Sequence, residues 1–68
     1  MTDRMAEGLR YLSAEFSVTA DEFRRDNAPG GDMLLMGAVS KGYAREGRGR
    51  FAVTEAGRRY LDGVAHGE

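Results

Sequence analysis

The stretch of sequence that decides the fold is KGYAREGRGRFAVTEAGRRYL, residues 41–61. Short β-prone runs at 43–46 and 50–53 enclose the glycine-containing segment 47–49, and this pattern predicts a two-stranded β-hairpin. The apolar residues of the second run share one face, because neighbouring strand residues point to opposite sides. The hairpin therefore has an apolar face that can cover a small core. The side chains expected to do so are Tyr43, Phe51 and Val53.

A helix is predicted to follow the hairpin directly. Thr54 is a favourable N-cap residue, which places the start of the helix at Glu55. Gly57 would let the backbone of this helix approach the hairpin closely. The expected buried stripe consists of Tyr60, Leu61 and Val64. We expect residues 65–68 to form a frayed tail, so that a single domain spans residues 1–64.

The first helix is predicted over residues 2–16. Apolar residues recur there at positions i, i+4, i+7 and i+11, which indicates one buried face. These residues are Met5, Leu9, Leu12 and Phe16. Thr2 is the expected N-cap, followed by Asp3 in the first turn. The segment 16–18 is short and β-prone and predicts one further strand.

The clearest helix start in the sequence lies at Thr19. Glu22 follows it at the spacing of a capping box, in which each residue's side chain bonds the other's backbone amide. Val18 and Phe23 stand at the two positions of a hydrophobic staple. The helix therefore begins immediately after the cap, at Ala20, and it is short. The turn residues that end it are Asn27, Ala28, Pro29, Gly30 and Gly31.

A third helix is predicted with its body over residues 33–41, which are rich in apolar side chains. Two starts remain open. Either Pro29 sits in the first turn, where its missing amide costs nothing, or Asp32 caps the helix after the glycines. The helix ends at Gly42, the expected glycine just past its last residue.

The segment 34–61 resembles part of a known family. Its motifs are Leu34-Leu35, Lys41-Gly42-Tyr43, the basic hairpin and Val53-Thr54-Glu55-Ala56-Gly57. They resemble the third helix, the wing and the following helix of winged helix-turn-helix domains in bacterial and archaeal transcription regulators. Residues 19–23 resemble the start of the helix-turn-helix, and residues 1–15 a generic leading helix. The resemblance implies a small α+β fold with about four helices and a two-stranded β-hairpin wing.

The resemblance also implies duplex DNA as the partner. In DNA-binding members the third helix, here residues 31–41, enters the major groove, and the wing, here residues 45–50, lies beside it. The residues expected to contact nucleic acid are Arg45, Arg48, Arg50, Lys41, Ser40, Arg24 and Arg25. The expected function is that of a small transcription regulator or an accessory factor of a mobile element.

The third helix nevertheless has a poor face for reading bases. Between Gly30 and Ser40 there is no Arg, Lys, Asn or Gln, the side chains that most often pair with base edges. This favours an alternative, in which the domain binds a larger protein, for example as a phage-encoded inhibitor or adaptor. Met33 and Met36 are then the candidate partner-binding residues. We expect both to fill the core instead, because so small a domain needs several inward-facing apolar residues.

Composition restricts the function classes further. The chain has 68 residues and no cysteine, and its single histidine, His66, stands near the end. A thiolate site, a zinc site of the usual kind and a catalytic triad are therefore not expected. No nucleophile–base pair is visible either. We expect neither a metal or other cofactor nor enzymatic activity.

Charge and hydropathy complete the expectations. The formal net charge is −1, but residues 24–59 hold eight basic and four acidic side chains. Such a basic centre can meet phosphate. No apolar run approaches the ~20 residues of a membrane span, and the charges in residues 1–12 are unlike a signal peptide. We expect a cytoplasmic protein, in which the first or last helix could also form a homodimer.

Overall fold

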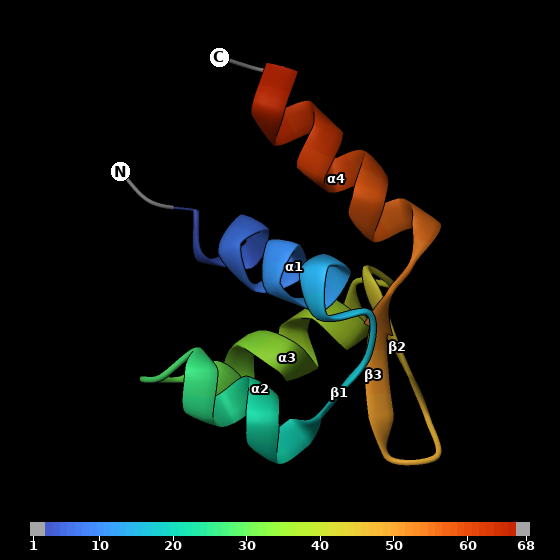
Figure 1. Cartoon of the computed structure of the whole chain (residues 1–68). Helices are drawn as coiled ribbons and strands as arrows, with labels where there is room; N and C mark the ends of the chain where they lie inside the picture. The colour runs from blue at the N-terminus through green and yellow to red at the C-terminus, as the bar shows by residue number, and fades with distance from the viewer. Residues whose placement is uncertain (1–2, 67–68) are drawn as a thin grey trace.

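Residues 3–66 are described by a computed structural model and form four helices and one three-stranded antiparallel sheet. The elements follow in the order α1 (Arg4–Glu15), β1 (Val18–Thr19), α2 (Ala20–Asp26), α3 (Gly31–Ser40), β2 (Ala44–Gly47), β3 (Arg50–Val53) and α4 (Glu55–His66). The strand order in the sheet is β1-β3-β2. This is the predicted small α+β fold, with the short early strand added to the hairpin, and it is consistent with a winged-helix arrangement (Figure 1).

The core lies where the first three helices meet the sheet. α1 packs against α3, β3 and α4, while α2 packs against α3. In Figure 1, the α2–α3 pair and the hairpin turn lie at the end of the molecule opposite the last turn of α4. The buried residues of the main core cluster are Leu9, Leu12, Val18, Phe23, Leu35, Ala38, Ala44 and Val53.

α1 is shorter than predicted at both ends. Asp3 is its N-cap, and the Asp3 carboxylate accepts a 3.0 Å hydrogen bond from the Ala6 amide. The expected cap, Thr2, lies outside the described residues. At the other end the helix stops at Glu15.

Phe16 does not continue the buried stripe of α1, which corrects the sequence-based expectation. Its backbone has φ 73° and ψ −60°, and the Ser17 amide donates a 2.8 Å hydrogen bond to the Glu15 carbonyl. This is a γ-turn of the strained, positive-φ kind. It turns the Phe16 side chain outward, so that 87% of the residue is exposed. Val18, two residues later, enters the core instead.

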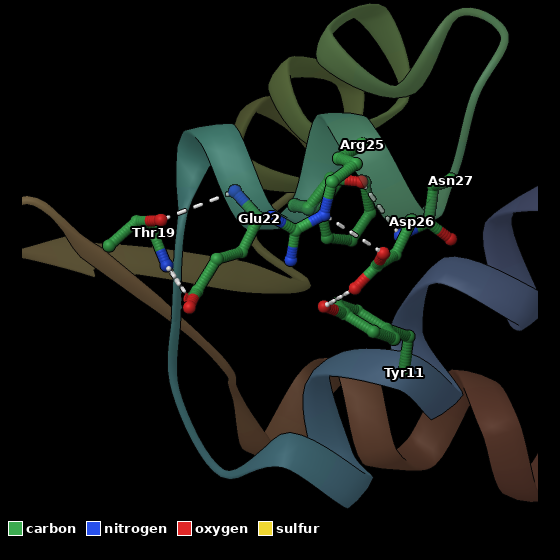
Figure 2. Close-up of polar contacts among 7 residues, drawn as sticks. Tyr11, Thr19, Glu22, Arg25, Asp26 and Asn27 are labelled. Atoms are coloured by element: carbon green, nitrogen blue, oxygen red, sulfur yellow. Dashed lines mark hydrogen bonds and ion pairs between the residues drawn. The ribbon is translucent and has the colours of Figure 1, made fainter.

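The predicted capping box at the start of α2 is confirmed (Figure 2). The Thr19 hydroxyl accepts from the Glu22 amide at 3.2 Å, and the Glu22 carboxylate accepts from the Thr19 amide at 3.0 Å. Val18 and Phe23 of the staple are both buried. Thr19 also ends β1, which pairs with β3, so the box fixes α2 directly to the sheet.

The start of α3 matches neither predicted alternative. Gly30 is the N-cap, in the left-handed region at φ 77° and without a side-chain hydrogen bond, while Asp32 is already the second helical residue. Pro29 precedes the cap. A Cβ on Gly31 would lie 2.9 Å from the Cα of Arg24. Glycine at this position therefore lets α3 begin in close contact with α2.

The hairpin has a two-residue turn. Arg48 and Gly49 occupy it with φ 55° and 77°, and positive φ at both positions matches the twist of paired strands. β2 begins at Ala44 and includes Gly47, so it begins and ends one residue later than predicted. The register pairs Ala44 with Val53 and Glu46 with Phe51, which places these four side chains on the core-facing side of the sheet.

α4 begins as predicted, and the Thr54 hydroxyl accepts a 3.1 Å hydrogen bond from the Gly57 amide. A Cβ on Gly57 would overlap the Tyr43 carbonyl and lie 2.6 Å from a Val53 methyl group, so the predicted close approach is confirmed. The predicted stripe is half-buried rather than buried, at Tyr60, Leu61 and Val64. The helix also includes residues 65–66, the first two residues of the expected tail, and residues 67–68 lie outside the described range.

Candidate nucleic-acid interface

The solvent-facing side of α3 is apolar. Met33 and Met36 are 77% and 70% exposed, and Val39 is 38% exposed. The expectation that the methionines fill the core is therefore wrong. The helical period places Leu35 and Ala38 on the core side and turns both methionines away from it.

An apolar groove of about 420 Å³ runs beside this surface, between α2, α3 and β3. The side chains of Leu35, Met36 and Val39 line it from α3, and Phe51 lines it from the sheet. Its other lining residues are Ala20, Arg24, Asp32 and Ser40. Two of the predicted contact residues, Arg24 and Ser40, thus lie at the groove.

The three hairpin arginines are exposed, and the structure brings them together. Arg45 and Arg50 share the sheet face opposite to Phe51, because they alternate with the core-facing residues. Arg48 occupies the turn between them. All three line a shallow cleft of about 380 Å³ on the outer side of the hairpin. Arg45 and Arg50 therefore lie on the sheet face opposite to the groove beside α3, and Arg48 lies at the turn.

Local hydrogen bonds hold the hairpin turn in place. The Glu46 carboxylate accepts a 2.7 Å hydrogen bond from the Gly49 amide, across the turn that carries Arg48. The Arg50 guanidinium donates to the Ser17 carbonyl at 3.4 Å, a long contact that directs this side chain toward β1. Among residues 3–64, whose side chains the structure describes, none forms a hydrogen bond or an ion pair with the exposed Arg48 side chain.

The other cationic residues predicted to contact nucleic acid differ in whether they form ion pairs with acidic side chains. Arg24 forms an ion pair with Asp21, and Arg25 with Asp26. Within the described part of the chain, none of the ion pairs involves Lys41, the C-cap of α3, or any hairpin arginine. Four of the cations without an ion pair in this part of the chain therefore lie within residues 41–50, and Arg10 of α1 and Arg58 of α4 are further exposed cations without one.

The shifted pKa values belong to contacts that join helices, away from the groove. The Tyr11 hydroxyl donates a 2.6 Å hydrogen bond to the Asp26 carboxylate (Figure 2). That bond, together with burial, raises the pKa of Tyr11 to about 12, and the same bond lowers the pKa of Asp26. Because the pair ties α1 to the end of α2, it is a structural contact and indicates no acid–base chemistry.

Residues 3–66 contain neither a metal cluster nor a membrane-spanning helix. No three acidic or histidine side chains gather there closely enough to hold a metal ion. No helix in that range combines the length and the apolar character that crossing a membrane requires. Comparisons with protein-family models, curated proteins and solved structures found no match to this chain.

Proposed function

We propose that this protein is a winged-helix protein that binds duplex DNA and anchors on its phosphates through the β2–β3 hairpin. The supporting observation is the cluster of Arg45, Arg48 and Arg50, exposed and without acidic partners among the described residues. Arginine side chains in such a position replace counterions condensed on the duplex, and release of those counterions favours binding.

The proposed binding mode places α3 in the major groove and the hairpin against the flanking backbone. Lys41 and Ser40, at the end of α3, lie next to the hairpin in sequence and add a cation and a hydroxyl for a phosphate. Arg24 and Arg25 contribute less, because their ion pairs with Asp21 and Asp26 offset their charge. The protein would act in the cytoplasm as a transcription regulator or an accessory factor of a mobile element, without catalysing a reaction.

The test is a titration of a labelled duplex of about 30 bp, followed by fluorescence anisotropy at about 50 mM and about 200 mM salt. We expect salt-sensitive binding by the natural chain. Changing Arg45→Gln and Arg48→Gln together should weaken binding and reduce the salt slope by about 0.9 for each phosphate that is no longer neutralised.

A matched control removes the same charge elsewhere. Arg10→Gln with Arg59→Gln lowers the net charge equally, and both residues are exposed and lie outside the hairpin. This control should bind nearly as the natural chain does. Equal loss in both double variants would refute the hairpin as the anchor. No binding at the lower salt would refute duplex binding itself.

A second candidate function is binding to a larger protein through α3. The observation that favours it is the exposure of Met33 and Met36 beside an apolar groove. Exposed apolar patches rimmed by polar residues commonly mark interaction sites. In that case Met33→Glu with Met36→Glu should abolish capture of the partner while the circular dichroism spectrum stays unchanged. Unchanged capture by this variant would rule out α3 as the contact.

A further inference from the structure

The exposed arc of α3 offers a nucleic acid almost no hydrogen-bonding side chains. Its apolar members, Met33, Met36 and Val39, follow one another at intervals of three residues and lie side by side along the helix. Only Asp32 and Ser40 add polar groups to this arc. Neither carries an N–H donor of the kind that pairs bidentately with guanine or adenine. A helix with this surface cannot read purine edges by the usual pairs.

The major groove does contain one apolar group that such a surface fits. Each thymine presents a C5-methyl group there, and apolar side chains contact it. A methionine side chain is unbranched and polarizable, so it adapts to methyl groups at irregular positions. Leu35 and Phe51 line the groove beside Met36. This groove extends the same apolar surface toward the hairpin.

We infer that α3 recognises the C5-methyl groups of pyrimidines in the major groove, so that the protein prefers duplexes rich in them. The inference rests on the proposed function, because it requires α3 to face DNA. Two pyrimidine bases carry this C5-methyl group, thymine and 5-methylcytosine.

Charge around the apolar surface supports DNA as its occupant. Lys41 ends α3, and Arg24, although it forms an ion pair with Asp21, lines the groove. Arg48 lies at the turn of the hairpin, whose residue Phe51 also lines the groove. Methyl groups in a major groove are flanked by phosphates on both sides, so an apolar strip with cations beside it is complementary to them. Asp32 can accept from a cytosine amine within the same site.

The decisive experiment compares two duplexes that differ only in the methyl groups. One contains thymine, and the other contains deoxyuridine at every thymine position, with the same phosphates and base pairs. Anisotropy titration should show about fourfold weaker binding for each contacted methyl group that is removed, which corresponds to the burial of one such group. The salt slope should stay the same for both duplexes, because no phosphate contact changes.

Variants assign the effect to α3. Met33→Gln with Met36→Gln should bind the two duplexes equally, since the apolar contacts are gone. Phe16→Ser removes an exposed apolar side chain outside α3 and should keep the full preference for thymine. Circular dichroism spectra of the variants should match that of the natural chain, because all three side chains are exposed. A further pair of duplexes, one with cytosine and one with 5-methylcytosine at the same positions, shows whether the methyl group of 5-methylcytosine is also bound.

Each contrary outcome has a distinct meaning. Equal, salt-sensitive binding of the thymine and uracil duplexes would overturn methyl recognition and leave the proposed function standing. A preference that survives in the methionine double variant would also overturn it. Absence of binding to every duplex at low salt would overturn both. Concentration-dependent dimerisation that Met36→Gln abolishes would identify α3 as a self-association surface and equally contradict the inference.

Discussion

The phenolic hydroxyl of Tyr60 donates a 2.7 Å hydrogen bond to the Asp3 carboxylate, 57 residues earlier in the chain. The second oxygen of the same carboxylate caps α1 through the Ala6 amide. One acidic side chain therefore holds the beginning of α1 and the middle of α4 together. The hydrogen bond from Tyr60 is the main reason why the pKa of Asp3 lies below its ordinary value of 3.8.

Acid should therefore weaken the fold. Because the folded pKa of Asp3 is lowered, its stabilising contribution is present above pH 3.8 and is lost as the pH falls through the folded value. The pKa of Asp26 is lowered as well, mainly by its bond from Tyr11, and adds to the effect. We expect the thermal midpoint, followed by circular dichroism, to fall as the pH is lowered below the ordinary aspartate value of 3.8.

The matched variant for this experiment is Tyr60→Phe. It removes the hydroxyl, so the midpoint should be lower at neutral pH and should fall less on acidification, while the contributions of Asp26 and of the Ala6 hydrogen bond to Asp3 remain. Tyr43→Phe is the control, since the Tyr43 hydroxyl makes no hydrogen bond with residues 3–66 although its ring stacks on Tyr60. If the natural chain and Tyr60→Phe lost stability in parallel, the Tyr60–Asp3 hydrogen bond would not be the cause of the acid sensitivity.

Two glycines of α4 should respond in opposite ways to replacement by alanine. At Gly57 a Cβ would collide with the Tyr43 carbonyl, a backbone atom that cannot move alone, so Gly57→Ala should cost about 1–3 kcal/mol. At Gly63 a Cβ meets nothing within 4 Å, so Gly63→Ala should stabilise the helix by up to about 1 kcal/mol. Urea unfolding of the two variants measures the sign of the change in the free energy of unfolding for each. Stabilisation by Gly57→Ala would show that the hairpin and α4 are not in close contact.

Replacing Phe16 should show the strain in its γ-turn. Positive φ in a residue with a Cβ costs on the order of 1–3 kcal/mol, whereas glycine adopts this region freely. Phe16→Gly should therefore be at least about 1 kcal/mol more stable than Phe16→Ala, although alanine is normally the better helix former. The free energies of unfolding of the two variants give the answer. A more stable alanine variant would exclude a positive φ at this position.

Thr54 takes part in four hydrogen bonds at the junction of β3 and α4, one of them from the Arg58 amide to its carbonyl at 3.0 Å. Its hydroxyl donates to the Gly42 carbonyl at 2.6 Å and accepts from the Gly57 amide, and its own amide donates to the Tyr43 carbonyl at 2.9 Å. Thr54→Val keeps the shape and loses the hydroxyl, so it should cost about 1–2 kcal/mol. Thr54→Ser keeps the hydroxyl and should cost clearly less. A loss in Thr54→Ser as large as that in Thr54→Val would show that the methyl group contributes as much as the hydroxyl and would contradict the prediction.

Local signals explain what the sequence can predict. The Thr19–Glu22 box and the Thr54 cap are interactions between residues three apart, and the structure confirms both. The close approach at Gly57 is predictable as well, because a glycine in the first turn of a helix leaves room for the backbone of an adjacent hairpin. These features depend on short stretches of chain, where residue type and spacing decide the outcome.

Long-range contacts explain what the sequence cannot predict. The Arg4 guanidinium donates to the carbonyls of Asn27 and Pro29 at 2.9 and 2.8 Å, and the Tyr60–Asp3 bond spans almost the whole chain. No local pattern indicates either contact. The expectation for the methionines of α3 is wrong for a related reason, since an apolar helix with a weak period does not reveal which of its sides meets the core. Their exposure is decided by where α1, α2 and β2 pack against α3, not by the sequence of α3 alone.

The joint between α3 and the hairpin has a consequence for the shape of any ligand that contacts both. The Tyr43 amide donates to the Ala38 carbonyl at 2.8 Å, and the Tyr43 carbonyl accepts from the Thr54 amide, so the base of the hairpin is fixed on both strands. The base of the hairpin is consequently held at a fixed position relative to the end of α3. B-form DNA offers a wide major groove beside an accessible backbone, whereas the major groove of A-form RNA is deep and narrow. A stiff joint would thus discriminate between the two helical forms without any contact to a 2′-hydroxyl group.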